Sequence, residues 1–152
     1  MGILNMTPDS FSQDGQFKKG LSISVSRALR YARKLIRDGA DYIDVGGEST
    51  RPGAVRISVE EELRRTIPVI TKLVRGTNIP VSIDTYKPLV AEQALAAGAV
   101  IVNNIMGVKV SKRLLKLVRE YKASIVLMHI NGTPRTMQKR IQGGDFFKEI
   151  VR

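Results

Sequence analysis

Short apolar runs alternate with longer segments of helical periodicity along the whole chain. The runs have the length of buried strands and lie at residues 1–4, 42–45, 80–84, 100–103 and 124–129. Between them, apolar residues recur with a period of about 3.6 residues. This period predicts helices near 22–37, from Ser58 through Val74, near 87–97 and at 111–121. Strands and helices that alternate in this way form a parallel sheet with right-handed crossovers.

Local signals mark the ends of several of these helices. Glycines at 39 and 98 are typical of helix ends that need a positive φ. Ser58, followed by Glu61 three residues later, is a capping-box pattern for the start of the second helix. Pro68 should remove one backbone hydrogen bond from that helix and kink it. No linker or low-complexity tract interrupts the pattern, so the 152 residues are expected to form one domain.

Each predicted strand finishes in a polar side chain, in order Asn5, Asp44, Asp84, Asn103 and His129. Ligands of parallel α/β folds bind at the carboxyl ends of the strands. Polar residues at every successive strand end favour a barrel with a ring of site residues on one rim over an open sheet. Because five units are fewer than eight, we expect an α/β fold of the (β/α)8 TIM-barrel type, truncated to about five βα units.

The chain is strongly basic, with a net charge of +11. Residues 109–152 contain eleven Lys or Arg against three acidic residues, so about +8 of the charge lies there. Near 109–119 the basic residues recur at helical spacing beside leucines, which is typical of the wet face of a surface helix. Nucleic-acid binding is the alternative, but only 5% of the chain is aromatic and no stacking platform is visible. We therefore expect an anionic small-molecule substrate and no nucleic-acid partner.

The chain contains no cysteine, which excludes a disulfide framework, a thiolate metal site and a catalytic thiol. This composition suits a reducing cytosol, so a cytoplasmic location is expected. No stretch approaches the roughly 18 apolar residues of a membrane span. The first residues also lack the charged-then-apolar layout of a signal peptide. No membrane partner is therefore expected.

Two of the polar strand ends have both a functional and a structural interpretation. Asp84 could accept paired N–H groups from a heterocycle, or it could cap the helix that follows. Asn103 offers a donor and an acceptor that could bind the edge of a ring, or it could hold a loop backbone. His129 is the only histidine, and a structural role is favoured for it, since a zinc site would need more such ligands. These alternatives stay open at the level of the residues.

The glycine-rich segment after the second strand, residues 46–53, combines glycines, hydroxyls and one arginine. It suits phosphate or carboxylate oxygens, with Arg51 as a planar donor of several hydrogen bonds. It is not a Walker loop, because no Gly-Lys-Ser/Thr follows. The flanking Asp44 and Glu48 could serve only to brace it. Oxygen-bearing residues that include Asn5 suit Mg²⁺.

Five motifs resemble those of the dihydropteroate synthase family, in the same order and spacing. The two long motifs are Asn5-Met-Thr-Pro-Asp-Ser-Phe-Ser12 and Asp44-Val-Gly-Gly-Glu-Ser-Thr-Arg-Pro-Gly53. The shorter ones are Ser82-Ile-Asp-Thr85, Val102-Asn103 and Val126-Leu-Met-His129 with the Gly-Thr-Pro that follows. The resemblance covers the whole chain but only about the first half of the family's barrel. It implies a single pterin-binding domain over residues 1–152, incomplete at its C-terminus.

The resemblance implies a transferase of folate biosynthesis. Such enzymes condense 6-hydroxymethyl-7,8-dihydropterin diphosphate with 4-aminobenzoate to give 7,8-dihydropteroate and pyrophosphate. By analogy, Asp84 and Asn103 would hydrogen-bond the pterin and Met128 would pack against it. Two alternatives are the pterin-binding barrel of a corrinoid methyltransferase and a non-catalytic pterin-binding remnant. The resemblance also allows a homodimer of the full-length enzyme.

The remaining implied roles concern the anions and the reacting centre. Asn5 would hold Mg²⁺, the implied cofactor, on the diphosphate. Thr50 and Arg51 would receive the diphosphate and the neighbourhood of the aminobenzoate. Asp9 and Phe11 lie on the loop that closes over the reacting centre in the family. Asp9, Phe11 and Arg51 are therefore the candidate catalytic residues.

The chain departs from the family pattern at several positions. Asn104 stands where the family usually has Asp, which removes a charge near the expected pterin pocket. Ile130-Asn131 replaces a common Met-Gln after the histidine. A barrel of five strands would leave its first and fifth strands unpaired on one side, with inward side chains such as Ile83 and Val102 lacking partners. We therefore expect residues 1–152 alone to be catalytically inert and prone to associate.

Overall fold

The computed structural model describes residues 1–7, 25–49, 55–107 and 110–128. Within these residues the strands and helices alternate strictly along the sequence, as the hydrophobic pattern predicts. They are β1 (Gly2–Asn5), α1 (Val25–Arg37), β2 (Ile43–Gly46), α2 (Val59–Gly76), β3 (Val81–Asp84), α3 (Pro88–Ala96), β4 (Ile101–Asn104), α4 (Lys112–Glu120) and β5 (Ser124–Leu127).

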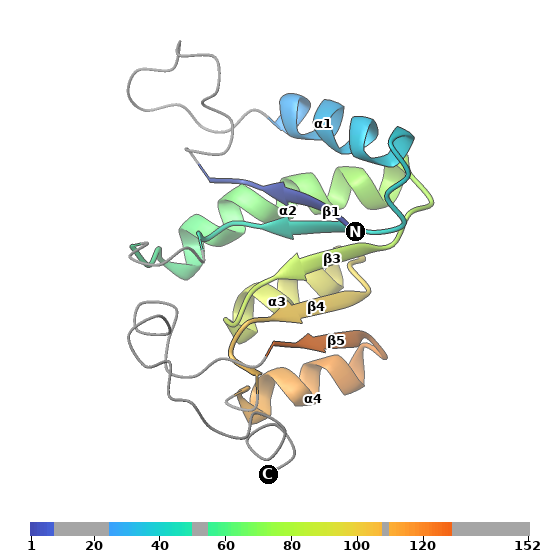
Figure 1. The fold of residues 1–152 in the computed structure, drawn as a ribbon. Coiled ribbons are helices and arrows are strands. Elements are labelled where there is room, and N and C mark those ends of the chain that lie inside the picture. The colour runs from blue at the N-terminus through green and yellow to red at the C-terminus, as the bar shows by residue number, and fades with distance from the viewer. Residues whose placement is uncertain (8–24, 50–54, 108–109, 129–152) are drawn as a thin grey trace, which may run out of the picture.

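The five described strands form one parallel sheet in the order β1-β2-β3-β4-β5. In Figure 1 all five arrows run in the same direction, and each strand lies beside its neighbour in the sequence. A doubly wound sheet reverses its strand order at a switch point, whereas a barrel adds each new strand to the same edge. The order therefore confirms the expected fold class, an α/β sheet of consecutive barrel units.

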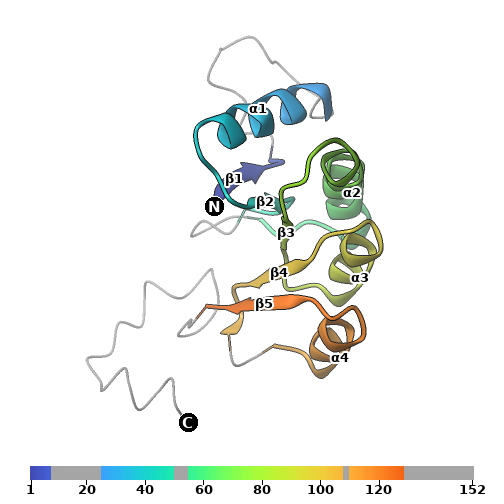
Figure 2. The ribbon, with the colours of Figure 1, turned by 90° about the vertical axis from the view of Figure 1, so that its right-hand side faces the viewer.

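The helices cover one face of this sheet. Figure 2 shows α2, α3 and α4 in a column along that face, with α1 beside β1. Leu4, Val45, Ile83 and Val102 are fully buried in the core between strands and helices. The expectation that Ile83 and Val102 point into the barrel is therefore wrong. Both lie on the helix-facing side of their strands, because side chains alternate along a strand.

The other face of the sheet is more exposed at its two edges. Ile3 on β1 is 58% exposed and Val126 on β5 is 44% exposed. Among the described residues, this second face is therefore not fully covered. Five polar strand residues lie on this second face and form the candidate site: Asn5, Asp44, Ser82, Asp84 and Asn103.

The helices begin and end largely where the sequence predicts. The Ser58 side chain caps α2 by accepting a hydrogen bond from the Glu61 backbone N–H at 3.2 Å. Gly39 and Gly98 have φ of 97° and 102° after their helices, as the stop signals require. The helix α2 continues through Pro68 without interruption. None of the helices in the described part of the chain has the length and apolar character needed to traverse a bilayer.

The basic helix α4 lies on the surface. Its apolar side chains Leu114, Leu117 and Val118 are buried, while Lys116 and Arg119 are exposed. This arrangement confirms the amphipathic surface helix expected for part of the basic segment. The remaining residues of that segment, from His129 onward, lie outside the described residues.

Candidate functional site

The strand register places side chains of the second face in two rows across all five strands. The rim row, nearest the carboxyl ends of the strands, contains Asn5, Gly46, Asp84, Asn103 and Val126. The lower row contains Ile3, Asp44, Ser82, Ile101 and Ser124. Three of the predicted site residues therefore share one row, at the edge where ligands of parallel α/β folds bind.

Asp84 is the most perturbed side chain of the rim row. Its Oδ1 atom is buried without a hydrogen-bond partner. Burial, and after it the negative charges of Asp44, Glu62 and Glu48, together raise the pKa of Asp84 to about 7. A buried carboxyl group with an unsatisfied oxygen is a functional-site candidate, because a ligand with N–H groups would supply the missing donors.

The alternative role of Asp84 as a helix cap is not observed. The N-cap residue of α3 is Lys87, and its backbone N–H is bonded to Thr85 Oγ1 at 3.2 Å. Thr85 therefore shapes the turn after β3, which leaves the Asp84 carboxyl group facing the rim row. Of the two roles that the sequence left open for Asp84, the helix cap is therefore excluded.

Asn103 and Asp44 contact each other across the intervening strand β3. Asn103 Nδ2 donates a hydrogen bond to Asp44 Oδ2 at 3.0 Å. Asp44 is 4% exposed, and its Oδ1, like the Oγ of the neighbouring Ser82, is buried without a partner. Asp44 does not end its strand as the sequence predicts, since it lies two residues before Gly46 in the lower row. Among the described residues, its side-chain hydrogen bond is with Asn103, and none is made to residues 46–49 of the glycine-rich segment.

Asn104, the departure from the family pattern, lies on the other side of the sheet from Asn103. Consecutive strand residues point to opposite faces, and Asn104 is fully buried. Its Oδ1 accepts a hydrogen bond from the Met106 backbone N–H at 2.7 Å. The loop-holding role considered for Asn103 therefore belongs to Asn104. The expectation that Asn104 removes a charge near the ligand pocket stays a prediction.

Gly46 leaves a space in the rim row between two oxygen-bearing side chains. A Cβ atom at this position would lie 3.2 Å from Asn5 Oδ1 and 3.4 Å from Asp84 Oδ2. Asn5 is exposed at the end of β1, so its amide oxygen can be reached from solvent. Among the described residues, His, Asp and Glu side chains do not gather in a group of three that could hold a metal ion. Asn5 therefore fits a metal that takes one protein ligand and completes its shell with water and phosphate oxygens.

A second polar cluster lies beside the rim row, where β2 and β3 meet their helices. Lys87 Nζ donates to Glu48 Oε2 at 2.7 Å, to Glu62 Oε2 at 2.6 Å and to the Ile57 carbonyl oxygen at 2.7 Å. Tyr86 donates its hydroxyl proton to Glu48 Oε1 at 2.8 Å. We call Glu48, Ile57, Glu62, Tyr86 and Lys87 the Lys87 network. Glu48 braces its loop as expected from the sequence.

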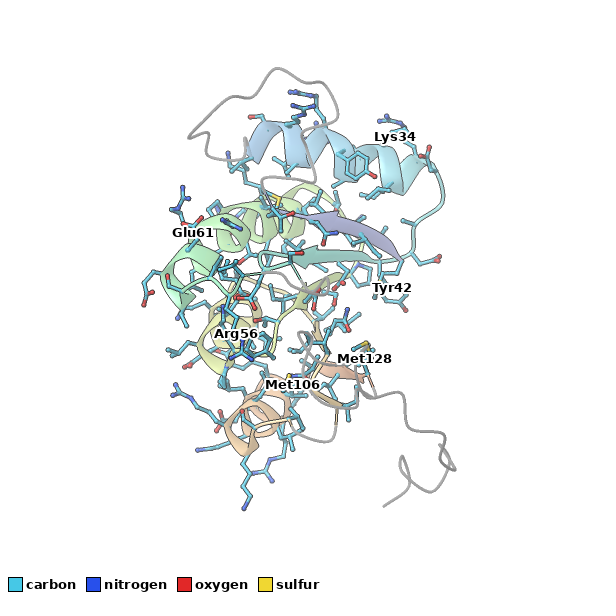
Figure 3. The ribbon with its side chains drawn as sticks, turned by 60° about the vertical axis from the view of Figure 1, so that its left-hand side comes forward. Lys34, Tyr42, Arg56, Glu61, Met106 and Met128 are labelled. Atoms are coloured by element: carbon cyan, nitrogen blue, oxygen red, sulfur yellow. The ribbon has the colours of Figure 1, made fainter. Side chains whose placement is uncertain are left out.

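Two arginines, Arg56 and Arg65, lie near this network and the chain it holds. The Arg56 guanidinium lies 5.7 Å from the centroid of the Tyr86 ring. Figure 3 shows Arg56 and Glu61 on the carboxyl-end side of the strands, with Tyr42 at the opposite end. Arg65 from α2 donates to the Gly47 carbonyl oxygen at 3.0 Å. The chain on both sides of the glycine-rich segment is therefore held by side chains of other elements.

Comparison with known proteins identifies the family of the chain. A family model described as pterin binding enzyme matches residues 1–152, the whole chain. The chain belongs to the pterin binding enzyme family. This finding confirms the family resemblance carried by the motifs.

Individual relatives agree with this assignment. A dihydropteroate synthase of Synechocystis sp. is 48% identical over 150 residues, which cover 99% of this chain and 50% of the relative. The crystal structure of Yersinia pestis dihydropteroate synthase in a sulfonamide drug complex matches with a TM-score of 0.85 at 37% identity, covering 99% of this chain and 53% of that one. Burkholderia cenocepacia dihydropteroate synthase complexed with 7,8-dihydropteroate matches with a TM-score of 0.72 at 44% identity, over 90% and 43%. The chain thus spans about half the length of the relatives it matches.

The structure brings three of the predicted site residues, Asn5, Asp84 and Asn103, to one row of one face. Met128 directly follows β5, and its backbone N–H donates to the Asn104 carbonyl oxygen at 3.1 Å. Met128 is 39% exposed. The other predicted site residues, which are Asp9, Phe11, Thr50 and Arg51, lie outside the described residues. His129 also lies outside them.

Sequence reasoning did not identify Lys87 and Glu62, and it gave Ser82 no role. Glu62 follows two other glutamates at the start of a helix, where acidic residues are common, so its burial has no local signal. Ser82 did carry a signal, since Ser82 and Asp84 alternate with the apolar Val81 and Ile83. That alternation, read as a half-polar strand, would have indicated which residues face the site.

Proposed function

We propose that the protein is a dihydropteroate synthase. The proposed reaction condenses 6-hydroxymethyl-7,8-dihydropterin diphosphate with 4-aminobenzoate to give 7,8-dihydropteroate and pyrophosphate. The observation that carries the proposal is the buried Asp84 carboxyl group, with its unpartnered oxygen and its pKa of about 7, in the same row as Asn103 and Asn5. Relatives named dihydropteroate synthase, one of them solved with 7,8-dihydropteroate, support it.

Recognition of the pterin follows from the hydrogen-bonding groups of the rim row. A pterin ring presents adjacent N–H donors on one edge, and a carboxylate accepts paired donors well. Asp84 is proposed to accept them in its ionised form, which would satisfy the buried Oδ1. The Asn103 amide, oriented by its bond to Asp44, is proposed to bind a further atom of the ring edge. Met128 is proposed to pack against the ring face.

In the proposed chemical step, the aryl amine nitrogen attacks the methylene carbon of the pterin. A C–N bond forms, the C–O bond to the diphosphate breaks, and the amine loses one proton. The electron-rich pterin can share the positive charge that develops on the methylene, so the protein mainly orients the partners and excludes water. Thr50 and Arg51 are proposed to receive the anions, and Asp9 and Phe11 to cover the reacting centre.

Magnesium is part of the proposal, with Asn5 as its protein ligand. Mg²⁺ usually keeps several waters and binds through few protein groups plus substrate phosphates. The exposed Asn5 amide oxygen at the rim fits such a site. When bound, the ion would neutralise charge on the departing diphosphate. We further propose a cytoplasmic location, in keeping with a chain that contains no cysteine, and a homodimer of the full-length protein.

The test of this function is the substitution Asp84→Asn in the full-length protein. Loss of the charged acceptor should weaken pterin binding by about 1.5–3 kcal/mol, the range for a hydrogen bond to a charged group. Calorimetric titration with the pterin diphosphate measures this loss, and an assay for dihydropteroate measures the reaction. Asp41→Asn, the same change at an exposed site before β2, is the matched control. Wild-type affinity in Asp84→Asn would refute the assignment.

Arg51 is tested separately by replacement with lysine. Lysine keeps the positive charge but loses the planar fork of donors, so the change should not behave as conservative. The expected result is a raised KM for the diphosphate substrate or for 4-aminobenzoate. Wild-type kinetics for both substrates would show that the glycine-rich segment has another role.

A further inference from the structure

The ammonium group of Lys87 uses all of its hydrogen-bonding capacity inside the protein. A lysine ammonium has three donors, and Lys87 Nζ has three partners, Glu48 Oε2, Glu62 Oε2 and the Ile57 carbonyl oxygen. The Lys87 side chain is 12% exposed, that of Glu48 9% and that of Glu62 1%. Lys87 therefore leaves no donor for a substrate, and any role in the reaction must be exerted through its partners.

Two of these partners, Glu48 and Ile57, flank residues 49–56 in the sequence. Residues 49–56 include Thr50 and Arg51, and we call them the anion-binding segment. Glu48 Oε2 also accepts a hydrogen bond from the Ile57 backbone N–H at 3.0 Å. Glu48, Ile57 and Lys87 thus form a closed ring of contacts that joins residue 48 to residue 57. The separation of the two ends is fixed by contacts made outside the segment.

The charge and burial of the Lys87 network favour a cation at position 87. Burial by itself would lower the pKa of Lys87, but hydrogen bonds and charge from Glu48 and Glu62 leave it raised. The pKa of Glu48 is lowered despite burial, because Lys87, the Ile57 N–H and Tyr86 donate to it. Without the ammonium, two buried carboxylates would share one region without compensation, which is strongly unfavourable.

Lys87 also lies on the same turn as the pterin candidate Asp84. Only Thr85 and Tyr86 separate them, and the Thr85 hydroxyl accepts a hydrogen bond from the Lys87 backbone N–H. Tyr86 donates its hydroxyl proton to the other oxygen of Glu48. A single short turn therefore connects the carboxyl group proposed to hold the pterin with both ends of the segment proposed to receive the anions.

We propose that Lys87 is a positioning residue that fixes residues 48 and 57, on either side of Thr50 and Arg51 in the sequence, relative to the turn that carries Asp84. It contacts no substrate. It holds residues 48 and 57 together and ties them to the turn after β3. This inference rests on the proposed function, because it assigns Lys87 a role within that same site.

The experiment compares Lys87→Met in the full-length protein with Lys34→Met. Lys34 is an exposed lysine paired with Asp38 on α1, and Figure 3 shows it far from Arg56. Two ligands are titrated, 6-hydroxymethyl-7,8-dihydropterin and its diphosphate. Because both contain the same ring, the affinity for the diphosphate divided by the affinity for the pterin reports the contacts to the diphosphate, including those of the anion-binding segment. Lys87→Met should lower that ratio by about 10- to 100-fold, which corresponds to the loss of one hydrogen bond to a charged group, while Lys34→Met leaves it unchanged.

A double variant separates positioning from general stability. Lys87→Met with Glu62→Gln removes one of the two uncompensated carboxylates, so its thermal stability should rise above that of Lys87→Met. The contact to the Ile57 carbonyl oxygen remains lost, so the affinity ratio should stay low. If stability and the affinity ratio recover together, Lys87 has only a structural role and the proposal is overturned.

Hydrogen exchange gives a readout that does not depend on catalysis. The Ile57 amide proton is bonded to Glu48, which Lys87 holds, and its exchange should accelerate in Lys87→Met. If the wild-type protein neither binds the pterin diphosphate nor forms dihydropteroate, the proposed function fails. Exchange at Ile57 then still decides whether Lys87 fixes the segment, and unchanged exchange overturns that role.

Discussion

The Asn103 side chain reaches across β3 to donate a hydrogen bond to Asp44 Oδ2 at 3.0 Å. The two residues lie on β4 and β2, which are not neighbours, and in different rows of the register. The bond directs Nδ2 of Asn103 toward the lower row. Asp44 therefore orients an amide that the proposed function assigns to the pterin, although Asp44 itself lies deeper in the fold.

The substitution Asp44→Asn should lower the pKa of Asp84. The negative charge of Asp44 is the second contribution to that raised pKa, after burial. Asparagine can still accept the bond from Asn103, so the change removes charge while keeping the contact. The pKa of Asp84 should fall but remain above its ordinary value, because burial is unchanged. Titration of the Asp84 carboxyl carbon by NMR measures this shift, and an unaltered pKa would contradict the electrostatic coupling.

The stability of the full-length protein should decrease between about pH 4 and pH 7 through Asp84. The folded-state pKa is about 7 against an ordinary 3.8, so between these values the folded protein keeps a proton that the unfolded chain has released. The free energy of unfolding then decreases as the pH rises. Asp84→Asn should flatten this dependence and be more stable than wild type at pH 8. Urea unfolding at pH 5 and pH 8 measures both slopes, and parallel slopes for the two proteins would exclude the effect.

Pterin affinity should change with pH in the opposite sense. The proposed contact needs ionised Asp84, so binding should strengthen as the pH rises through about 7. In Asp84→Asn the affinity should lose this dependence. Calorimetric titration from pH 6 to pH 8 with the diphosphate-free pterin, which avoids phosphate ionisation, tests the prediction. Binding by wild type that weakens over this range would indicate that the protonated carboxyl group is the binding form.

Alanine at the two adjacent glycines should produce different defects. At Gly46 the added Cβ would lie 3.2 Å from Asn5 Oδ1 and 3.4 Å from Asp84 Oδ2, so Gly46→Ala should weaken ligand binding with little loss of stability. At Gly47 it would lie 2.8 Å from Glu62 Cγ and from Thr66 Cγ2. Gly47→Ala should therefore destabilise the fold by about 1–3 kcal/mol, as overpacking does. Denaturant midpoints and calorimetry on both variants distinguish the two outcomes.

Residues 1–152 expressed alone should self-associate and form no dihydropteroate. In the described sheet β1 and β5 each have one strand neighbour, and their side chains Ile3 and Val126 are 58% and 44% exposed. Open edges of this kind pair with other chains, so Ile3→Lys and Val126→Lys should reduce association. Sedimentation velocity and the dihydropteroate assay measure the two effects. A monomeric, cooperatively unfolding and active product would overturn the prediction.

The positions of the elements follow from the sequence because periodicity is a local property. Predicted strands and helices agree with the structure to within a few residues, as at 124–129 against Ser124–Leu127. It was harder to predict which side chains of each strand face the helices. Ile83 and Val102 were placed inside the barrel because their strands were treated as uniformly apolar. The alternation of Asp44, Ser82 and Asp84 with apolar neighbours would have placed those two side chains correctly.

The sequence predicted those site residues whose position in a strand is itself a signal. Asp84 and Asn103 stand at strand ends and were found there. The pKa of Asp84 depends first on burial and then on the charges of Asp44, Glu62 and Glu48, and no local sequence pattern reports their approach. The same holds for Lys87, whose partners are 25 to 39 residues away in the sequence. Sequence reasoning therefore missed the charged residues that come together only in the tertiary structure.

The Lys87 network also imposes an order on folding during synthesis. Glu48 and Glu62 leave the ribosome 39 and 25 residues before the lysine that neutralises them. Until the turn after β3 emerges, burying those carboxylates would leave them without a counter-charge, so they remain in water. The Lys87 network can therefore form only after the third βα unit has supplied Lys87, so the final packing at this point requires three consecutive units of the chain.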